Sequence, residues 1–354
     1  MAALSIISPG RKTAVVLFNL GGPDAPASVQ PFLFNLFNDP AIIGLPQLFR
    51  RPLASFISHR RAPVAQGIYE EMGGKSPILE NTEAQKHALE ASLSGHGDVK
   101  VFVAMRYWHP MSDDVAKQVQ QFAPDHIILL PLYPHFSTTT TGSSFTDWDR
   151  AAEKIKLKTP TSKVCCYPTH AEFIKAHAML LRTYYQEAAR FGTPRILFSA
   201  HGLPEKIVKS GDPYQSHIEA TTQAVLKELD MPNIDYVNCY QSRVGPMKWI
   251  TPATTDELLR AGFEKKPVVL VPIAFVSEHS ETLVELDIEY AELAHANGVD
   301  HYYRVPTLST QAHFIAALTD ICLRLTTDTQ LAPEPGGRRC APEWKQCPCN
   351  QRSA

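Results

Sequence analysis

The sequence lacks the features that assign many chains to a class at once. It contains neither GxxxxGK(S/T) nor GxGxxG, so the usual phosphate-binding loops of nucleotide sites are missing. Its formal net charge is −2, which gives no broad basic field for nucleic acid. The longest apolar runs, near Ile127–Tyr133 and Val268–Val276, are about ten residues or fewer, whereas a membrane-spanning helix needs about 20.

A signal or transit peptide is also not evident, since only Arg11 and Lys12 precede the first apolar segment. We therefore expect a cytoplasmic protein. Its seven cysteines should then be thiols or metal ligands and not disulfides. Cys239 and Cys322 stand alone in apolar surroundings and are predicted to be small buried residues.

Eight short apolar, β-branched segments recur along the chain, and helix-like segments separate most of them. The predicted strands are Ala14–Leu20, Val99–Met105, His126–Tyr133, Lys163–Tyr167, Arg195–Ala200, Asp235–Tyr240, Val268–Ala274 and His301–Val305. The predicted helices include Asn81–Leu93, Ala171–Phe191 and Ser216–Leu229. This alternation favours an α/β fold with parallel sheets and helices on both faces.

The two halves of the chain resemble each other. Leu17–Asp24 reads LFNLGGPD where Leu197–Glu205 reads LFSAHGLPE, and the later strands of each half match in the same order. We therefore predict two Rossmann-like domains, each a four-stranded parallel sheet flanked by helices, facing each other across a cleft. The expected boundaries are 12–192 and 193–325, with the last helix packing on the first domain. Residues 326–354 are predicted to be a Pro/Gly-rich linker and a cysteine-rich tail.

His201 directly follows the strand Arg195–Ala200 and is followed by Gly202. A lone histidine is more often a core residue bonded to a carbonyl. The strand-end position reverses that expectation, because open α/β sheets bind ligands at the carboxyl ends of their strands. A second strand, Val268–Ala274, leads to His279 and Glu281, and imidazole and carboxylate together suit metal handling or proton transfer.

Glu281, Glu285 and Glu289 are spaced four apart and would share one face of an α-helix. Such spacing usually marks a solvated acidic stripe. Here the stripe follows a buried strand, so its first turn should lie at the ligand edge of the sheet. A divalent cation there would relieve the repulsion between the carboxylates.

The segment Pro31–Ser58 is rich in Phe, Leu and Ile, is interrupted by Pro40, Pro46 and Pro52, and has arginines at 50, 51, 60 and 61 on or beside it. It is either a helical hairpin packed on the core or an exposed apolar lip with basic edges. The second interpretation would suit a membrane surface or a large flat ligand.

Cys340, Cys347 and Cys349 crowd into the last fifteen residues. They are either incidental thiols of a disordered tail or metal ligands that need a fourth partner: Cys165, Cys166 or a histidine. The paired CxxC knuckles of structural zinc sites are absent, so an iron–sulfur cluster is the better interpretation.

Seven motifs in order resemble those of the ferrochelatase family, over about Lys12 to Leu325. They are LFNLGGPD, MGGKSPI, MRYWHP, PLYPHFSTTTTGSS, FSAHGLPEKIVKSGDPY, YQSRVGPMKWITPAT and SEHSETLVELDIEY. The tail is similar to the extension of bacterial ferrochelatases that carry a 2Fe–2S cluster.

The resemblance implies an enzyme that inserts Fe2+ into protoporphyrin IX to form haem b, the last step of haem biosynthesis, with release of two protons. His201 would accept a pyrrole proton or hold iron, Glu281 with His279 beside it would act at the same site, and Glu285 and Glu289 would carry iron or protons. The implied porphyrin contacts are Leu20, Arg61, Tyr69, Ser76, Arg106, Tyr107 and Trp249.

The resemblance also implies cluster ligands. Animal members with a cluster have one cysteine ligand in the hydroxyl-rich loop, where this sequence has Thr138. The set implied here is Cys166, Cys340, Cys347 and Cys349, with Cys165 as the alternative to Cys166.

Other interpretations remain open at this point. The chain could be a chelatase for coproporphyrin or another divalent metal, or a carrier that binds haem or another tetrapyrrole. The carboxylates favour an enzyme, since a carrier needs no proton or iron path behind its ligand. We expect peripheral association with the inner face of a membrane and no nucleic-acid partner, and a homodimer is left open.

Overall fold

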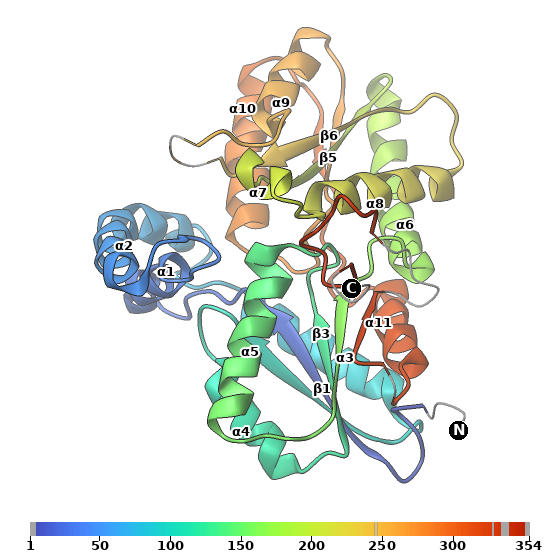
Figure 1. Ribbon diagram of the computed structural model, residues 1–354. Helices are drawn as coiled ribbons and strands as arrows, with labels where there is room; N and C mark the ends of the chain where they lie inside the picture. The colour runs from blue at the N-terminus through green and yellow to red at the C-terminus, as the bar shows by residue number, and fades with distance from the viewer. Residues whose placement is uncertain (1–4, 244, 246, 328, 334–339, 351–354) are drawn as a thin grey trace. The chain divides into compact units, whose positions relative to one another are not determined.

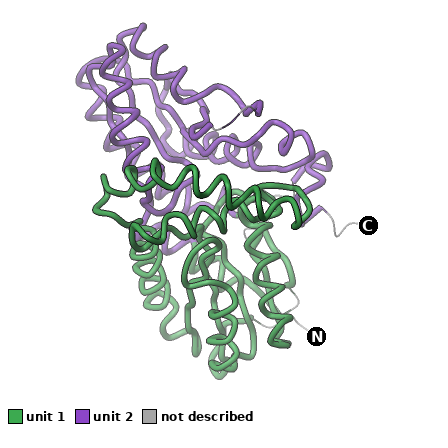
Figure 2. The backbone as a smooth tube through the Cα atoms, turned by 90° about the vertical axis from the view of Figure 1, so that its left-hand side faces the viewer, with its two compact units in different colours: residues 1–166, 318–338 green, residues 167–317, 339–354 purple. Residues whose placement is uncertain are grey.

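The computed structural model describes residues 5–243, 245, 247–327, 329–333 and 340–350. The chain divides into two compact units, residues 1–166 with 318–338 and residues 167–317 with 339–354 (Figure 2). The expected domain boundary after residue 192 falls inside the second unit. The reason is α6 (Ala171–Ala188), which packs on α8 (Tyr214–Leu229) and on β7 (Val268–Pro272).

The first unit is built on a parallel sheet with the strand order β2-β1-β3-β4-β9. The strands are β1 (Lys12–Asn19), β2 (Asp98–Met105), β3 (His126–Pro131), β4 (Thr161–Cys166) and β9 (Leu331–Pro333). β1 pairs with β2 on one side and β3 on the other, and it is buried along nearly all of its length. A strand covered on both faces reads as a continuous apolar run, which explains why this one was visible in the sequence.

Helices cover both faces of the first sheet (Figure 1). α4 (Ser112–Phe122) and α5 (Ser143–Lys154) pack on one face, where the Phe18 ring meets those of Phe145 and Trp148 edge-on at 6.0 and 5.9 Å. α3 (Ile78–Leu93) lies on the other face. Residues 318–324 of α11 (Ala312–Arg324) lie beside it, and Thr319 donates a 2.8 Å hydrogen bond to Ser92.

The first sheet has one strand more than the four predicted. β9 comes from the stretch expected to be a linker, and it pairs with β4 through a parallel ladder. A three-residue strand that ends in proline is too short and too polar in its surroundings to be recognised from a pattern. Proline is accepted there because an edge strand leaves one side of its backbone unpaired. The remainder of the expected linker, residues 334–339, lies outside the described residues.

The second unit contains a parallel sheet with the order β6-β5-β7-β8. Its strands are β5 (Arg195–His201), β6 (Asp235–Gln241), β7 and β8 (Tyr302–Arg304). α9 (Thr254–Phe263) and α10 (Tyr290–Ala296) pack on one face, and α6 and α8 lie on the other (Figure 1). This order repeats that of the first four strands of the first sheet, so the predicted internal repeat and α/β class are confirmed. All eight predicted strands are present, with ends within two residues of those expected.

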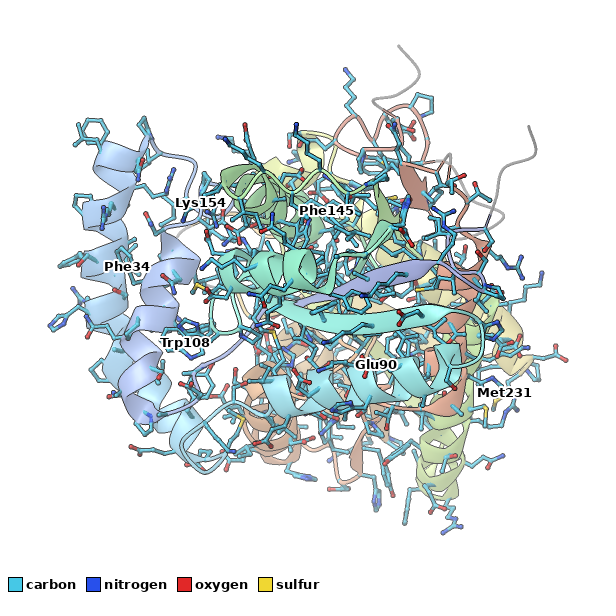
Figure 3. The ribbon with its side chains drawn as sticks, turned by 90° about the horizontal axis from the view of Figure 1, so that it is seen from below. Phe34, Glu90, Trp108, Phe145, Lys154 and Met231 are labelled. Atoms are coloured by element: carbon cyan, nitrogen blue, oxygen red, sulfur yellow. The ribbon has the colours of Figure 1, made fainter. Side chains whose placement is uncertain are left out.

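The remaining short elements connect these layers. They are η1 (Pro26–Ser28), α1 (Val29–Phe37), α2 (Gln47–Glu70), η2 (Thr138–Gly142), η3 (Ala189–Phe191), α7 (Glu205–Lys209) and η4 (Glu281–Glu289). η2 and η4 are π-helical. Helices α1 and α2 lie side by side, as Figure 3 shows with Phe34 and Trp108 labelled. No helix in the described part of the chain is long and apolar enough to cross a membrane.

Candidate active site

The carboxyl ends of β5, β6 and β7 bring polar side chains together in the second unit. β5 lies between β6 and β7, so the chain leaves the sheet in opposite directions from its central strand. Ligands of open α/β sheets bind at such a switch point. β5 ends on His201, and the chain after β7 continues into η4.

His201 and Glu281 form the centre of this group. The His201 Nδ1 atom lies 2.9 Å from Glu281 Oε2, and the two side chains are 36% and 27% exposed. Burial opposes the charged imidazolium, but the Glu281 carboxylate outweighs burial and raises the pKa of His201. Burial also opposes the charge on the Glu281 carboxylate, but the interaction with His201 outweighs burial and lowers the pKa of Glu281. The sequence predicted both residues, and the structure brings them together as a hydrogen-bonded pair.

A second carboxylate, Glu285, lies behind this pair. It accepts hydrogen bonds from Gln241 Nε2 (3.0 Å), Ser242 N (2.9 Å), Ser242 Oγ (2.5 Å) and Tyr290 Oη (2.9 Å). Burial and the neighbouring Glu281 charge nevertheless raise the pKa of Glu285. Ser242 also contributes to lowering the pKa of Glu281.

The sequence analysis missed the two residues that complete this network, Gln241 at the end of β6 and Ser242 directly after it. The signal was present, because β6 ends at the same edge of the sheet as β5. Polar residues at the end of a third adjacent strand belong to the same ligand edge.

Glu289 does not join Glu281 and Glu285. The expected sharing of one face assumed an α-helix, whereas η4 is π-helical from Glu281 to Glu289. Glu289 is exposed, and its part in an iron or proton path stays a prediction.

His279 is buried at the turn that leads into η4. Its Nδ1 lies 3.0 Å from the Ser277 carbonyl, and its backbone N–H donates to Thr282 Oγ1 at 2.9 Å. Burial lowers the pKa of His279, whereas that of His201 is raised. It contributes to the shape of the turn that presents Glu281.

Trp249 lies against the backbone that follows His201. A Cβ atom added at Gly202 would come within 2.9 Å of the Gln241 carbonyl oxygen and 3.2 Å of the indole ring. Glycine therefore permits the half-buried Trp249 to pack next to the catalytic candidate, at the place where a flat ligand contact was predicted.

The other predicted porphyrin contacts lie in the first unit. Leu20, Tyr69 and Tyr107 belong to one apolar cluster with residues of α1. Ser76 is buried next to Gly22, where an added Cβ would come within 2.5 Å of the Ser76 side chain. Tyr69 and Tyr107 are buried in the described structure, so they pack behind the surface of this cluster and expose little of their own rings.

Arg106 is held by a carboxylate that the sequence analysis did not single out. Asp39 Oδ2 accepts hydrogen bonds from Arg106 Nη2 (2.9 Å), Tyr107 Oη (2.7 Å) and the Ser143 hydroxyl, and the Asp39 side chain is only 2% exposed. Arg106 Nε donates to Ser143 Oγ at 2.6 Å. The segment after α1, the end of β2 and the start of α5 thus meet at one buried charge. Asp39 is a lone acidic residue in an apolar stretch, and nothing in its spacing indicated this role.

The arginines that flank the apolar lip have different environments. Arg50 donates to the backbone carbonyls of Asn38 (2.9 Å) and Leu45 (2.6 Å), so it fixes the loop between α1 and α2. Arg61 is exposed on α2, with its guanidinium carbon 6.0 Å from the centre of the Phe37 ring. Arg61 can therefore meet an anionic ligand without breaking an internal ion pair.

The tail cysteines gather within the second unit. Cys340 and Cys349 hydrogen-bond to Cys347 and lower its pKa to about 3. Cys340 Sγ also lies 3.1 Å from His217 Nε2. In the first unit, Cys165 and Cys166 are both buried with their sulfurs 3.4 Å apart. No group of three or more His, Cys, Asp and Glu side chains among the described residues has the arrangement of a metal site, so a cluster stays a prediction.

Comparison with known proteins identifies the family. A family model described as Ferrochelatase matches residues 12–325. The chain belongs to the ferrochelatase family. Ferrochelatases are lyases that act on a porphyrin and a metal ion in haem biosynthesis, so the chain is an enzyme of this class, as predicted.

Individual ferrochelatases match nearly the whole chain. The ferrochelatase of Caulobacter vibrioides is 52% identical over 350 residues, which cover 96% of this chain and 98% of that protein. The ferrochelatase of Pelagibacter ubique is 49% identical over 343 residues, covering 96% and 98%. Among solved structures, SirB from Bacillus subtilis with Fe3+ has a TM-score of 0.51 and 13% identity, covering 87% of this chain and 93% of that one. At that identity the likeness concerns the fold alone.

Proposed function

We propose that this ferrochelatase inserts Fe2+ into protoporphyrin IX and releases haem b and two protons, with His201 and Glu281 at the reacting atoms. The observation that carries the proposal is the 2.9 Å contact between His201 Nδ1 and Glu281 Oε2 at the ligand edge of the sheet. An imidazole oriented by a carboxylate is suited to accept a proton, because the carboxylate fixes the tautomer and stabilises the imidazolium.

His201 Nε2 is the atom that accepts a pyrrole proton in this proposal. A ring that donates its Nδ1–H to Glu281 presents Nε2 as an acceptor. The Glu281 carboxylate stabilises the imidazolium that forms. Since the His201 side chain is 36% exposed, the imidazolium releases the first proton to water, after which Nε2 accepts the second. Glu285, whose pKa is raised, lies behind the pair as a further proton acceptor.

Porphyrin binding is assigned to both units. Leu20, Tyr69, Ser76 and Tyr107 would form an apolar wall, with Trp249 against the macrocycle near His201. Arg61, which has no ion pair of its own in the described contacts, would pair with a propionate. Arg106 already shares Asp39, so it would meet a propionate with the part of its guanidinium that Asp39 and Ser143 do not occupy.

Protoporphyrin is favoured over coproporphyrin by the apolar lip, residues 31–58. Its exposed side chains include Leu48 (78%), Phe49 (63%) and Phe56 (62%). Vinyl groups are less polar than the extra propionates of coproporphyrin, so an apolar lip suits the former.

The same lip supports the proposal that the protein binds a membrane surface peripherally. An apolar pocket of about 770 Å³ lies between α1 and α2 and is lined by Phe34, Leu48, Arg51 and Pro52, among others. Exposed apolar side chains next to Arg51, Arg60 and Arg61 match an interface with anionic headgroups.

The tail is proposed to hold a 2Fe–2S cluster, with Cys340, Cys347, Cys349 and Cys166 as ligands. The donor set fits in part, because three thiols of the tail already meet and favour a thiolate at Cys347. When bound, such a cluster supplies a redox centre and a staple for the tail. Cys165 is the alternative to Cys166, since both are buried with their sulfurs 3.4 Å apart.

The test of this function is an anaerobic fluorescence assay of porphyrin consumption with Fe2+. His201→Ala should lower turnover by at least about 100-fold, since a positioned proton acceptor contributes roughly that much. His295→Ala, which removes another histidine of the same unit outside the site, is the matched control. Near wild-type turnover in His201→Ala would exclude the assignment, and faster turnover of coproporphyrin than of protoporphyrin would correct the substrate.

A further inference from the structure

The π-helix η4 carries both carboxylates of the candidate site, Glu281 and Glu285. A π-helical turn is rare because its wider ring packs less well than an α-helical one, so a run of nine residues needs support from outside the helix. The support comes from β8, the edge strand of the second sheet.

Arg304, the last residue of β8, bonds to both sides of the segment that holds the carboxylates. Its Nε donates to Asp287 Oδ1 at 2.6 Å, and its Nη2 donates to Asp287 Oδ2. Its Nη1 donates to Glu278 Oε1 at 2.6 Å. Glu278 precedes η4, and Asp287 lies near its end. One guanidinium, 10% exposed, therefore spans the stretch that contains Glu281 and Glu285.

A second contact from β8 fixes the backbone of the same helix. Tyr302 Oη donates to the Leu286 carbonyl at 2.7 Å, and Leu286 is fully buried in the core of this unit. β8 itself is held by its parallel pairing with β7, in which Leu270 is opposite Arg304. The position of η4 is thereby tied to the sheet that also positions His201.

Charge explains why an arginine is needed here. Glu278, Glu281, Glu285 and Asp287 lie within ten residues, and like charges at such spacing repel. Arg304 neutralises the outer two, and its three hydrogen bonds to them are charge-assisted and directional. The inner two are left for His201 and for Ser242.

We infer that Arg304, assisted by Tyr302, is a positioning residue for the metal-insertion reaction. It holds η4 in the π-helical register that places Glu281 against His201 and Glu285 against Ser242. The inference rests on the proposed function of the His201–Glu281 pair.

The alternative is that Arg304 only stabilises the fold, and Arg195 provides a matched control for it. Arg195 begins β5, six residues before His201, and is 5% exposed. It also binds two carboxylates, with Nη2 2.7 Å from Glu264 Oε2 and Nε 3.1 Å from Asp235 Oδ1. Its loss removes a similar buried network from the same sheet at the end remote from the site.

The experiment compares Arg304→Gln with Arg195→Gln in the full chain. Turnover, the KM for porphyrin, the melting temperature and hydrogen exchange of the amides in 281–289 are measured for both. Displacement of reacting groups by about 1 Å can cost up to about 100-fold in rate. We expect Arg304→Gln to lower kcat by at least about tenfold, with a porphyrin KM within about twofold of wild type. Faster exchange of the 281–289 amides should accompany this loss. Arg195→Gln should lower the melting temperature without either effect.

Two further variants keep the test decisive if Arg304→Gln folds poorly. Tyr302→Phe removes one hydrogen bond, and Arg304→Lys keeps the charge but cannot reach both carboxylates. Each should give a smaller fall in kcat with faster exchange confined to 281–289. The inference is overturned if Arg304 variants lose no more kcat than Arg195→Gln at equal loss of melting temperature. If His201→Ala also retains full turnover, the proposed function fails as well, whereas an inactive His201→Ala confines the failure to Arg304.

Discussion

At the scale of single residues, burial and the interactions between neighbouring charges act in opposite directions on the pKa values of the candidate site. Burial disfavours the charge on His201 and on Glu281, whereas the interaction between the two side chains favours both charges, raising the pKa of His201 and lowering that of Glu281. Glu285 has no cationic partner among its bonded groups, and its pKa moves in the opposite direction. Three side chains within one network therefore hold protons with different strength, which is what stepwise removal of two protons requires.

Titration of His201 tests this balance directly. Its pKa in the wild-type protein should lie above the ordinary value of 6.5, and Glu281→Gln should lower it, because burial is then opposed only by the Glu285 charge. NMR of protein labelled in its histidine rings, without substrate, measures both values. Glu289→Gln is the control and should leave the titration unchanged, since Glu289 is exposed away from the pair.

The sign of the linked stability follows from the same shifts. His201 stabilises the folded state fully below its unfolded pKa, and the contribution disappears as pH rises through its raised folded value. Glu281 contributes above its unfolded pKa, and that contribution disappears as pH falls through its lowered value. A His201 pKa below 6.5 in the wild type would show that burial and not the ion pair dominates the site.

Asp39 is the residue on which the first unit depends most clearly. Asp39→Asn should lower the free energy of unfolding by about 3 kcal/mol, because it leaves Arg106 as a poorly compensated cation. Ser143→Ala, which removes a neutral partner of the same oxygen, should cost only about 1 kcal/mol. Urea denaturation of the two variants checks the difference. Adding Arg106→Gln to Asp39→Asn should restore part of the stability, and strictly additive losses would contradict a coupled pair.

At the scale of elements, the sequence predicted what depends on local patterns. The strands β1, β3, β5 and β7 are continuous apolar runs because they are central, and their ends located His201 and the stretch up to Glu281. The π-helical form of η4 could not be predicted, since the spacing of its glutamates fits an α-helix equally well. Its register is set by Arg304 and Tyr302, which follow it in the chain and meet it only in the folded unit.

The α1–α2 pair shows why two interpretations of one segment were both partly right. Val29, Phe32 and Leu33 of α1 pack into the core with Tyr107, as a buried hairpin would. α2 instead presents Leu48, Phe49, Phe56 and Val64 to solvent. Composition alone does not tell which Leu and Phe side chains pack inward, because both helices carry them.

The exposed face of α2 should bind anionic membranes. Leu48→Ser with Phe49→Ser should reduce flotation with vesicles of phosphatidylcholine containing phosphatidylserine, and Arg51→Glu with Arg60→Glu should reduce it further at low salt. Binding of the wild type should weaken as salt rises, because the headgroup attraction is screened. Leu259→Ser with Phe263→Ser removes equally exposed apolar side chains of α9 and is the control. Equal flotation of all variants would show that the lip does not bind the membrane, which leaves porphyrin binding as its role.

At the scale of the whole molecule, the same strand order occurs in both sheets, but the equivalent strands end in residues with different roles. The second sheet places His201 at its switch point, whereas the equivalent strand of the first sheet ends in Asn19, which hydrogen-bonds within the unit to Thr82. The repeat was visible in the sequence because it lies in short motifs at the strand ends. The place of the tail was not, because its contacts, such as Cys340 with His217 and Gln346 with Gly211, join segments that are far apart in the sequence.

The tail is docked on the turn after α7. Gln346 N donates to the Gly211 carbonyl at 3.0 Å, and a Cβ added at Gly211 would lie 2.9 Å from the Lys345 nitrogen. Gly211 has φ +100°, so it is required both by its own conformation and by the close approach of the tail. Eleven described tail residues, 340–350, contain no helix or strand, and Cys347 is their fully buried side chain.

A metal-bound staple is therefore expected to decide whether the tail stays in place. Protein purified without oxygen should be red-brown and contain about two irons and two labile sulfides per chain. Cys347→Ser should bleach it and speed proteolysis of the tail, because a short segment without a core of its own depends on the metal for its fold. Cys322→Ala, which alters a buried thiol of α11 remote from the tail in sequence, should keep the colour.

Gly211→Ala should loosen the tail by displacing its backbone and leave the four proposed ligands intact. A partial loss of iron in this variant would show that docking of the tail and ligation of the metal are separate contributions. Zinc without sulfide in the wild type would identify a different metal. Bleaching by Cys165→Ser and not by Cys166→Ser would identify Cys165 as the fourth ligand. A colourless, fully active wild type would show that the three tail thiols only pack and bind no cluster.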